Sequence, residues 1–460
     1  MPVDVSAFKI YDIRGIYPDQ INARFMYTLG KAFATRFSPR KVVIGGDSRL
    51  SSEELRNALS DGLCDSGVDV LDLGLCGSEM VYFATGTYGL DGGLMITASH
   101  NPMEYNGCKM VVEGARPVGA ENGLNDIKTL IAEEGPFHHV DGKGSSRRGA
   151  CEWKDISDEF LSHVCDMLTQ ELDSGLKVVV NSGNGAAGPL IGRLADKLPC
   201  TLIPMFSEPD GRFPNGVPNP LLPENRQDTA DAVLANKADL GVAFDGDFDR
   251  CFFFDENGRF VEGYYIVGLM AAQMLEKYPG AKIVHDPRLT WNTIETVEKL
   301  GGQPVQSKTG HTFIKELMRK EAAAYGGEMS AHHYFRDFWY CDSGILPFLL
   351  MLELMSQSGK KLSALVDEAF HRYPVSGELN YRIDGDAGKL VKQIAEKYER
   401  QGGEVTSPDG LSVTFPDWRF SLRVSNTEPL LRLNVESRGD RLLMEQKKDE
   451  LEEKIRNGPE

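Results

Sequence analysis

Features that define several large classes of protein are absent from this 460-residue sequence. No apolar run approaches the roughly 20 residues that cross a membrane. The first residues lack the basic start and apolar stretch of a secretory signal, and low-complexity segments are missing as well. We therefore expect a globular cytoplasmic protein with no membrane partner.

Cysteine pairs and excess positive charge are missing too. The eight cysteines are scattered, with no C-x-x-C pair, which argues against a zinc site and a disulfide framework. The formal net charge of -18 disfavours nucleic acid as a partner. Small anionic substrates stay open, because a few clustered Arg and Lys side chains can make one cleft locally positive.

A strand–helix–strand pattern occurs three times along the chain. Its copies begin with the β-branched runs at 41–44, 177–180 and 282–284, each followed by polar residues and a segment of helical period. Such alternation predicts mainly parallel sheets covered by helices on both faces. In these sheets, ligands lie beyond the carboxyl ends of the strands.

The length and the repeat together predict four domains. We expect three similar α/β domains with mainly parallel mixed sheets, and then a smaller α+β domain, arranged around a central cleft. The sequence changes character near Tyr373-Pro374, after which the strands alternate as in an antiparallel sheet. The expected domains cover residues 1–148, 149–255, 256–372 and 373–460.

The third strand of the first repeat, Gly92–Ile96, runs into Thr97-Ala98-Ser99-His100-Asn101-Pro102. Because Pro102 disfavours a helical Asn101, we expect an extended loop in which Ser99 is exposed. An exposed serine at a strand end suits a nucleophile or phosphate carrier. The alternative is a turn serine that satisfies backbone groups.

Three aspartates follow the corresponding strand of the second repeat. Asp245, Asp247 and Asp249 alternate along the chain between apolar runs, so their carboxylates can converge. Crowded carboxylates repel one another unless a cation lies among them, and hard oxygen ligands favour Mg²⁺. The alternative is an Asp-Gly turn with solvated carboxylates. An EF-hand is poorly supported, because no Glu occupies the closing position.

Further polar groups could bind an anionic sugar. Arg423 to Thr427 offers a guanidinium, hydroxyls, an amide and backbone N–H groups for a phosphate dianion, although it could be an ordinary turn. Glu328 and Ser330 have the acceptor and donor character that sugar hydroxyls require. The other candidates, each of which could instead be a structural or surface residue, are Arg14, Lys109, Arg250, Arg288, His311 and His332.

Four of the segments named above appear in the order of the active-site loops of the α-D-phosphohexomutases. They are residues 97–102, 245–250, 327–332 and 423–429. The resemblance covers essentially the whole chain, and Gly327 to Asp337 makes it most similar to the bacterial phosphomannomutases. It implies that Ser99 is phosphorylated and binds Mg²⁺ together with the three aspartates. It further implies that Glu328 and Ser330 hold sugar hydroxyls. The non-reacting phosphate would be held by Arg423, Ser425, Asn426 and Thr427.

The resemblance also implies a reaction. An enzyme with phosphoserine at position 99 would interconvert mannose 6-phosphate and mannose 1-phosphate through a hexose 1,6-bisphosphate intermediate. The same bisphosphate would serve as activator, and the mannose 1-phosphate would supply GDP-mannose synthesis. Arg250 and Lys109 would stabilise the transferring group, with Arg14 and His332 near the reacting hydroxyl. Glucose phosphates are expected as further substrates. The rivals are a phosphoglucomutase, a metal-dependent sugar phosphatase and a non-catalytic sugar-phosphate sensor; a monomer and a dimer are both open.

Overall fold

The chain leaves one folded unit, forms most of a second, and returns to the first before ending in the second. The computed structural model describes residues 4–135, 137, 147–383, 386–424 and 430–458. Unit 1 comprises Met1–Phe260 and His332–Gly359, and unit 2 comprises Val261–Ala331 and Lys360–Glu460. The chain passes from unit 2 back to unit 1 between Ala331 and His332, so the candidate residues Ser330 and His332 belong to different units.

The first sheet of unit 1 has the order β1-β5-β4-β2-β3-β7, and β6 pairs with β5. β2, β3, β4 and β7 are parallel neighbours, whereas β1 and β4 pair with β5 in the antiparallel sense. Its strands are β1 (Ile13–Ile16), β2 (Lys41–Gly46), β3 (Asp69–Leu75), β4 (Gly92–Ile96), β5 (Tyr105–Val112), β6 (Arg116–Pro117) and β7 (Cys151–Trp153). β7 therefore adds to this sheet although it follows the boundary expected at residue 148.

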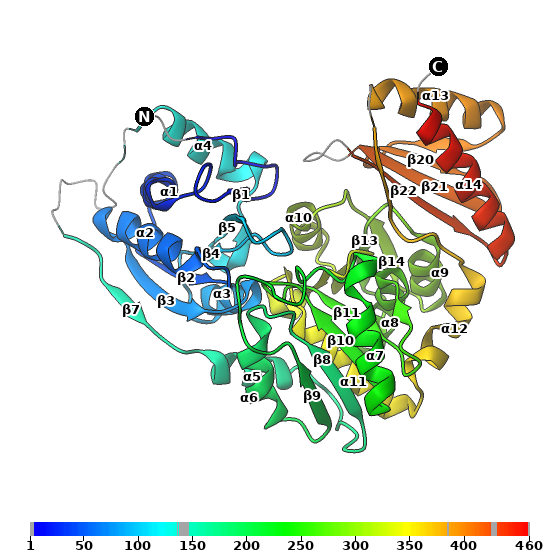
Figure 1. The fold of residues 1–460 in the computed structure, drawn as a ribbon, viewed down its shortest axis with the longest axis horizontal. Coiled ribbons are helices and arrows are strands. Elements are labelled where there is room, and N and C mark those ends of the chain that lie inside the picture. Colours follow the sequence, from blue (N-terminus) through cyan, green and yellow to red (C-terminus); the bar gives the residue numbers. More distant parts are fainter. Residues whose placement is uncertain (1–3, 136, 138–146, 384–385, 425–429, 459–460) are drawn as a thin grey trace. The chain divides into compact units, whose positions relative to one another are not determined.

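Helices cover both faces of this sheet (Figure 1). α1 and α2 bury the face that carries Ile44 and Leu94, whereas α3 packs on the opposite face through Val81. α1 and α2 approach closely because Gly62 has no Cβ; one there would lie 2.0 Å from the Tyr27 carbonyl oxygen. The helices are α1 (Ala23–Phe37), α2 (Ser52–Asp65), α3 (Ser78–Thr87) and α4 (Asn125–Ala132), with the short turns η1 (Glu113–Ala115) and η2 (Ala120–Leu124).

The second sheet of unit 1 contains the order β11-β10-β8-β9. β8 is parallel to both of its neighbours, and β11 folds back on β10 in the antiparallel sense. Every residue of β10 is buried, as expected of a central strand covered on both faces. The elements are α5 (Ser157–Cys165), β8 (Lys177–Asn181), α6 (Ala187–Ala195), β9 (Thr201–Met205), η3 (Pro223–Asn225), α7 (Gln227–Asn236), β10 (Leu240–Phe244), β11 (Cys251–Phe254) and β12 (Phe260–Val261).

The returning segment of unit 1 consists of an antiparallel strand pair and a buried helix. An isolated bridge joins Arg250 to His332, directly before this pair. The carboxylate of Glu79, on α3, accepts hydrogen bonds from the backbone N–H groups of Gly344 and Ile345, which satisfies the start of the helix. The elements are β16 (His333–Phe335), η4 (Arg336–Phe338), β17 (Cys341–Asp342) and α11 (Ile345–Ser358).

Unit 2 begins with a parallel strand arrangement and ends with an antiparallel sheet. β13 lies between β14 and β15 and is parallel to both. The elements are α8 (Gly263–Lys277), β13 (Lys282–His285), α9 (Trp291–Lys299), β14 (Gln303–Gln306), α10 (His311–Glu321), β15 (Tyr325–Gly327) and α12 (Leu362–Arg372).

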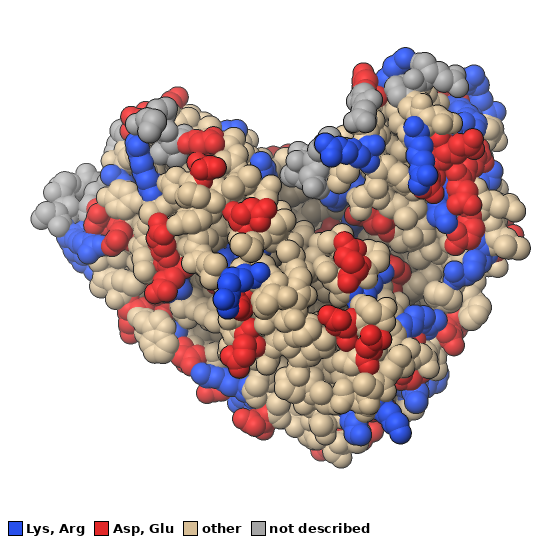
Figure 2. Space-filling model, in the orientation of Figure 1, with Lys and Arg blue, Asp and Glu red and all other residues tan. Residues whose placement is uncertain are grey.

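The C-terminal sheet has the order β18-β22-β21-β20-β19 and is antiparallel throughout. Tyr398, Phe420 and Leu451 belong to its apolar core. Acidic and basic side chains mix on the exposed face of its last helix, where Lys448 pairs with Glu445 (Figure 2). The elements are β18 (Leu379–Arg382), α13 (Ala387–Arg400), β19 (Glu404–Thr406), β20 (Leu411–Thr414), β21 (Trp418–Val424), β22 (Leu430–Ser437) and α14 (Arg441–Asn457).

The predicted fold class is confirmed: α/β layers of mixed, largely parallel strands precede a C-terminal α+β domain. Within the described part of the chain, no helix combines the length and the apolar character needed to cross a membrane.

Candidate active site

Ser99 lies in a tight turn after β4, and two expectations about it were wrong. Its exposed fraction is 2%, so it is buried, and its φ of 51° is left-handed rather than extended. Pro102 restricts only Asn101, its direct neighbour, so that restriction does not reach Ser99. The turn is instead set by hydrogen bonds from Ser99 N to Thr97 Oγ1 at 2.8 Å and from Asn101 N to Ala98 O at 3.0 Å.

The hydroxyl of Ser99 faces a carboxylate and a guanidinium from the second sheet. It donates a hydrogen bond to Asp245 Oδ2 at 2.8 Å, and Arg250 Nη2 lies 3.3 Å from its oxygen. Arg250 Nε also donates to Asp245 Oδ2 at 2.8 Å. His100 Nδ1 lies 2.9 Å from Ser99 Oγ. The predicted nucleophile thus lies beside a buried negative charge and a buried positive charge.

The three aspartates converge as predicted. Asp245, Asp247 and Asp249 are essentially fully buried, and each offers one carboxylate oxygen within 4.8 Å of the others. The Oδ1 atom of Asp247 is buried and has no hydrogen-bond partner among the residues that the structure describes. A buried carboxylate oxygen without a partner is costly. The donor set of three hard oxygens is the kind that Mg²⁺ prefers, so these residues fit a divalent cation.

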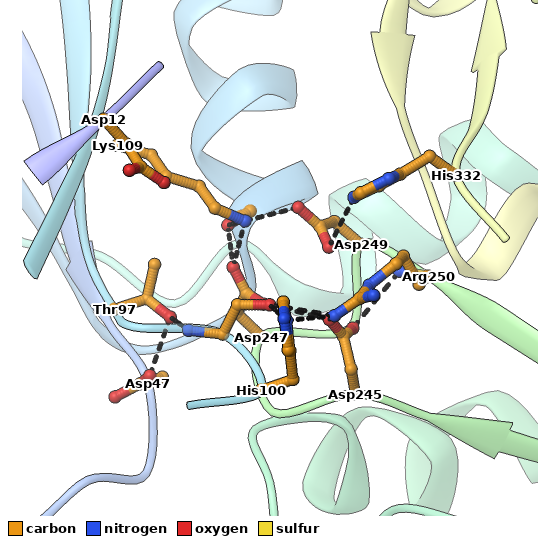
Figure 3. A network of polar contacts seen from close by, with 12 residues as sticks. Asp12, Asp47, Thr97, His100, Lys109, Asp245, Asp247, Asp249, Arg250 and His332 are labelled. Carbon is orange, nitrogen blue, oxygen red and sulfur yellow. Dashed lines mark hydrogen bonds and ion pairs between the residues drawn. The ribbon is translucent and has the colours of Figure 1, made fainter. Parts of the chain in front are cut away.

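Lys109 reaches the same carboxylates from β5 (Figure 3). Its Nζ donates to Asp247 Oδ2 at 2.6 Å and contacts Asp249 Oδ2. Burial lowers the pKa of Lys109, but the two aspartates outweigh it and hold the pKa above its ordinary value. The ammonium is therefore a permanent positive charge at the cluster, not the solvated surface lysine considered above.

Burial raises the pKa of a buried aspartate, whereas nearby cations lower it, and the balance differs between Asp245 and Asp249. Burial raises the pKa of Asp245 to about 6, despite the neighbouring Arg250 guanidinium. At Asp249 burial has the same effect, but the Lys109 ammonium and His332 outweigh it and hold the pKa well below its usual range.

His332 and Arg14 lie at the edge of this cluster. His332 Nε2 is 3.6 Å from Asp249 Oδ1, and its side chain is 19% exposed. Arg14 Nε donates to Asp12 Oδ2, and its Nη1 donates to Asn101 Oδ1, both at 2.8 Å. Burial lowers the pKa of Arg14, but Asp12 outweighs it and raises the pKa overall. Arg14 therefore keeps its charge, whereas a histidine can exchange a proton near neutral pH.

Sequence reasoning missed two residues of this cluster. Ser78, at the start of α3, donates its hydroxyl hydrogen to Asp247 Oδ2 at 2.5 Å. His100 lies between Ser99 and Arg250, and burial together with Arg250 holds its pKa well below the usual range. The sequence could have indicated His100, because it directly follows the proposed nucleophile. Nothing in the sequence indicated Ser78, because 169 positions separate it from Asp247.

Unit 2 gathers a second set of candidates around Arg288. Arg288 Nη2 donates to Asp286 Oδ2 at 2.6 Å and lies 3.2 Å from Ser330 Oγ and 3.5 Å from Glu328 Oε1. The predicted sugar-binding residues therefore lie together, joined by one guanidinium. The N–H of Gly310, directly before His311, donates to Glu328 Oε1 at 3.2 Å, which brings the start of α10 to the same set.

Arg423 lies at the end of β21. Its Nη1 is 3.5 Å from Asp409 Oδ2, and among the described residues its buried Nε has no hydrogen-bond partner. Burial and Arg288 lower the pKa of Arg423. Burial raises the pKa of Glu378, but Arg288, Arg432 and Arg423 outweigh it and lower the pKa overall. Arg288 Nη1 and Arg432 Nη1 lie 3.1 Å and 3.8 Å from the two carboxylate oxygens of Glu378, so these two guanidinium groups already share one anion. The remaining predicted phosphate ligands, Ser425, Asn426 and Thr427, lie outside the described residues.

Comparison with known families gives a match along nearly the whole chain. The models of the phosphoglucomutase/phosphomannomutase α/β/α domains I, II and III match residues 5–136, 158–258 and 262–373. The model of the C-terminal domain of that group matches residues 378–453.

Individual proteins are similar over their full lengths. A phosphomannomutase of Escherichia coli is 52% identical over 453 residues, with 97% of this chain and 98% of that protein covered. A protein of Xanthomonas campestris pv. campestris named phosphohexose mutases is 51% identical, with 98% and 99% covered. The crystal structure of a phosphoglucomutase/phosphomannomutase family protein from Burkholderia thailandensis superposes with a TM-score of 0.88 at 32% identity, with 99% and 98% covered.

Proposed function

The chain belongs to the phosphoglucomutase/phosphomannomutase family, and we propose that it interconverts mannose 6-phosphate and mannose 1-phosphate. Relatives of about half identity carry the name phosphomannomutase, which supports this choice within the family. We expect the enzyme to act in the cytoplasm, to supply GDP-mannose synthesis, and to turn over glucose phosphates as well.

One observation carries the proposal: the Ser99 hydroxyl lies 2.8 Å from Asp245 and within reach of Arg250, beside three buried aspartates. A serine oxygen that carries a phosphoryl group needs cations around it, because negative charge spreads over the equatorial oxygens during transfer. Arg250 and Lys109 supply two such charges.

In the proposed reaction, phosphoserine 99 transfers its phosphoryl group to O6 of a hexose 1-phosphate. The Ser99 Oγ–P bond breaks as the O6–P bond forms, and the proton on O6 passes to a base. We assign the base to His332, because imidazole is the commonest general base in enzymes and this side chain is partly exposed beside Asp249, whereas Asp12 keeps Arg14 charged. The resulting 1,6-bisphosphate turns around, and its C1 phosphoryl group returns to Ser99: the O1–P bond breaks as the Ser99 Oγ–P bond forms again, and the protonated base gives its proton to O1. The same bisphosphate would load an enzyme that has lost its phosphoryl group.

The fit of the aspartate cluster supports Mg²⁺ as the metal. Asp245, Asp247 and Asp249 would hold it together with an oxygen of phosphoserine 99. When bound, the ion would polarise the phosphoryl oxygens as a Lewis acid. Asp247 presents its unpartnered Oδ1 for this purpose, while Ser78 holds the other oxygen of the same carboxylate.

The candidates of unit 2 would bind the part of the substrate that does not react. Glu328 and Ser330 offer an acceptor and a donor for sugar hydroxyls, and Arg288 lies with them. His311 would join them, since the preceding residue, Gly310, donates its N–H to Glu328. The guanidinium of Arg423, whose Nε has no partner within the described part of the chain, would pair with the second phosphate, since charge-assisted hydrogen bonds to phosphate are among the strong ones. Ser425, Asn426 and Thr427 would complete that site.

An isomerisation assay tests the proposal against its rivals. Purified enzyme is given mannose 1-phosphate, Mg²⁺ and a trace of hexose 1,6-bisphosphate, while mannose 6-phosphate and inorganic phosphate are both followed. We expect mannose 6-phosphate as the main product, and none after Ser99→Ala. Release of inorganic phosphate as the main product would identify a phosphatase, and substrate binding without turnover would identify a sensor.

A further inference from the structure

Arg49 has no role in the reaction described so far, yet its side chain holds the loop that carries Ser99. It follows β2 within Gly45-Gly46-Asp47-Ser48-Arg49, and its side chain is 0% exposed. A fully buried guanidinium is costly unless its N–H groups are satisfied. Here every one of these groups can be accounted for.

Four of the hydrogen bonds go to backbone carbonyl oxygens of one short segment. Nη2 donates to Ser99 O at 2.9 Å and to Asn101 O at 2.6 Å. Nη1 donates to Pro102 O at 2.6 Å and to Tyr105 O at 2.9 Å. The planar fork of a guanidinium permits this pattern, which the three donors of a lysine cannot reproduce.

The fifth N–H group connects Arg49 to the other side of the same turn. Nε donates to Asp47 Oδ2 at 3.2 Å. Thr97 Oγ1 donates to the same oxygen at 2.7 Å, a contact drawn in Figure 3. Thr97 Oγ1 in turn accepts the hydrogen bond from Ser99 N at 2.8 Å. Both backbone polar groups of Ser99 are therefore tied to the Arg49–Asp47 pair.

This double attachment matters because the backbone of Ser99 is strained. A φ of 51° is uncommon for any residue with a Cβ, and such a conformation persists only where the surroundings enforce it. The backbone determines where Oγ lies relative to Asp245 and Arg250. Because Ser99 would both donate and accept a phosphoryl group, its Oγ needs this position in both transfer steps.

We propose that Arg49 is a positioning residue for phosphoryl transfer, whose guanidinium fixes the backbone of Ser99 and thereby aims the Ser99 hydroxyl at the reacting phosphorus. Arg49 acts through Ser99 and has no contact with substrate in this role. The inference rests on the proposed function, since it concerns the same transfer step. It predicts a defect in the rate of transfer and not in substrate binding.

Arg56 provides a matched control in the same domain. It lies on α2, the helix that follows β2 in the chain, and its Nε donates to Asp72 Oδ2 at 3.1 Å with the side chain 15% exposed. Its partner belongs to β3 and not to the Ser99 turn. Arg56→Lys therefore removes another largely buried guanidinium–carboxylate pair without loosening Ser99.

The experiment compares Arg49→Lys, Arg56→Lys and the parent enzyme in kcat, KM, melting temperature and the single-turnover rate of transfer from phosphorylated enzyme to mannose 1-phosphate. We expect Arg49→Lys to lower kcat and the transfer rate by about tenfold to a hundredfold, because small misplacements of reacting groups cost that much. We expect KM to change by less than about threefold, because the proposed binding groups are elsewhere. Arg56→Lys should keep the parent transfer rate.

Equal transfer rates in the two variants, or a loss confined to KM, would overturn the positioning role. Should Arg49→Lys fail to fold, Thr97→Val decides, since it removes only the hydroxyl that links Ser99 N to Asp47; a parent transfer rate in that variant would also overturn the role. A parent enzyme that never acquires a phosphoryl group would instead refute the proposed function.

Discussion

Replacing Lys109 with methionine should tighten the binding of Mg²⁺ while abolishing most turnover. The ammonium of Lys109 donates to Asp247 at 2.6 Å and contacts Asp249, which are two of the three proposed metal ligands. A divalent cation and this ammonium therefore compete for the same carboxylate oxygens. Methionine has a similar length and no charge, so it removes the competitor.

The size of the effect follows from the interactions that must be exchanged. A divalent cation and a unit positive charge 4 Å apart repel each other by about 8 kcal/mol at an effective dielectric constant near 20, so the ammonium is driven away from the ion. Its departure breaks two charge-assisted hydrogen bonds, each worth about 1.5–3 kcal/mol. Water around the freed ammonium restores much of that loss. A net gain of about 1.4–2.8 kcal/mol is expected, which is a tenfold to hundredfold tighter Kd.

Isothermal titration of Mg²⁺ into dephosphorylated enzyme without sugar measures this directly. Lys41→Met serves as the control, because Lys41, on β2, pairs with a carboxylate outside the aspartate cluster. Its contact with Glu152 is long, at 3.8 Å, and both side chains are substantially exposed. It should leave the Kd unchanged. A Kd for Lys109→Met equal to or weaker than that of the parent would refute the competition between ammonium and metal.

Three further predictions concern substrate binding, substrate choice and stability. Arg423→Ala should raise KM about tenfold or more, since a charge-assisted contact is lost, and Arg400→Ala on the exposed face of α13 should not; an unchanged KM would move the phosphate site elsewhere. Mannose 1-phosphate and glucose 1-phosphate should differ in kcat/KM by less than about a thousandfold, and a larger ratio would show that a buried group does read C2. Burial raises the pKa of Glu450, but Lys447 and Lys397 outweigh it and lower the pKa to about 2. The stability that the ionised carboxylate contributes is present above the ordinary pKa of 4.5 and is lost as the pH falls towards 2. In Glu450→Gln, the free energy of unfolding measured with urea should therefore fall less steeply over this pH range. A fall as steep as that of the parent protein would argue against the pairing.

Local patterns predicted the strands and the residue types of the site well. β4, β10 and β15 all end in the polar loops that the repeat indicated, because parallel strands covered on both faces read as short apolar runs. The convergence of Asp245, Asp247 and Asp249 followed from their alternation along one segment.

Contacts between distant segments could not be read from the sequence. Lys109 and Asp247 are 138 positions apart, and Arg49 reaches a loop about fifty positions away. The burial and left-handed backbone of Ser99 depend on such contacts and were therefore predicted wrongly. The crossing between units at Ala331 and His332 also left no mark in composition.

The central claim is that Ser99 carries the phosphoryl group between the two sugar phosphates. The most direct test loads the enzyme with labelled hexose 1,6-bisphosphate, locates the label by peptide mass spectrometry, and then adds mannose 1-phosphate. Ser182→Ala is the matched control, since Ser182 is a buried serine that follows β8. The account predicts that the label lies on Ser99 in the parent enzyme and in this control, that it leaves onto the sugar, and that Ser99→Ala acquires none. Label on another residue, or turnover at the parent rate by Ser99→Ala, would contradict the account.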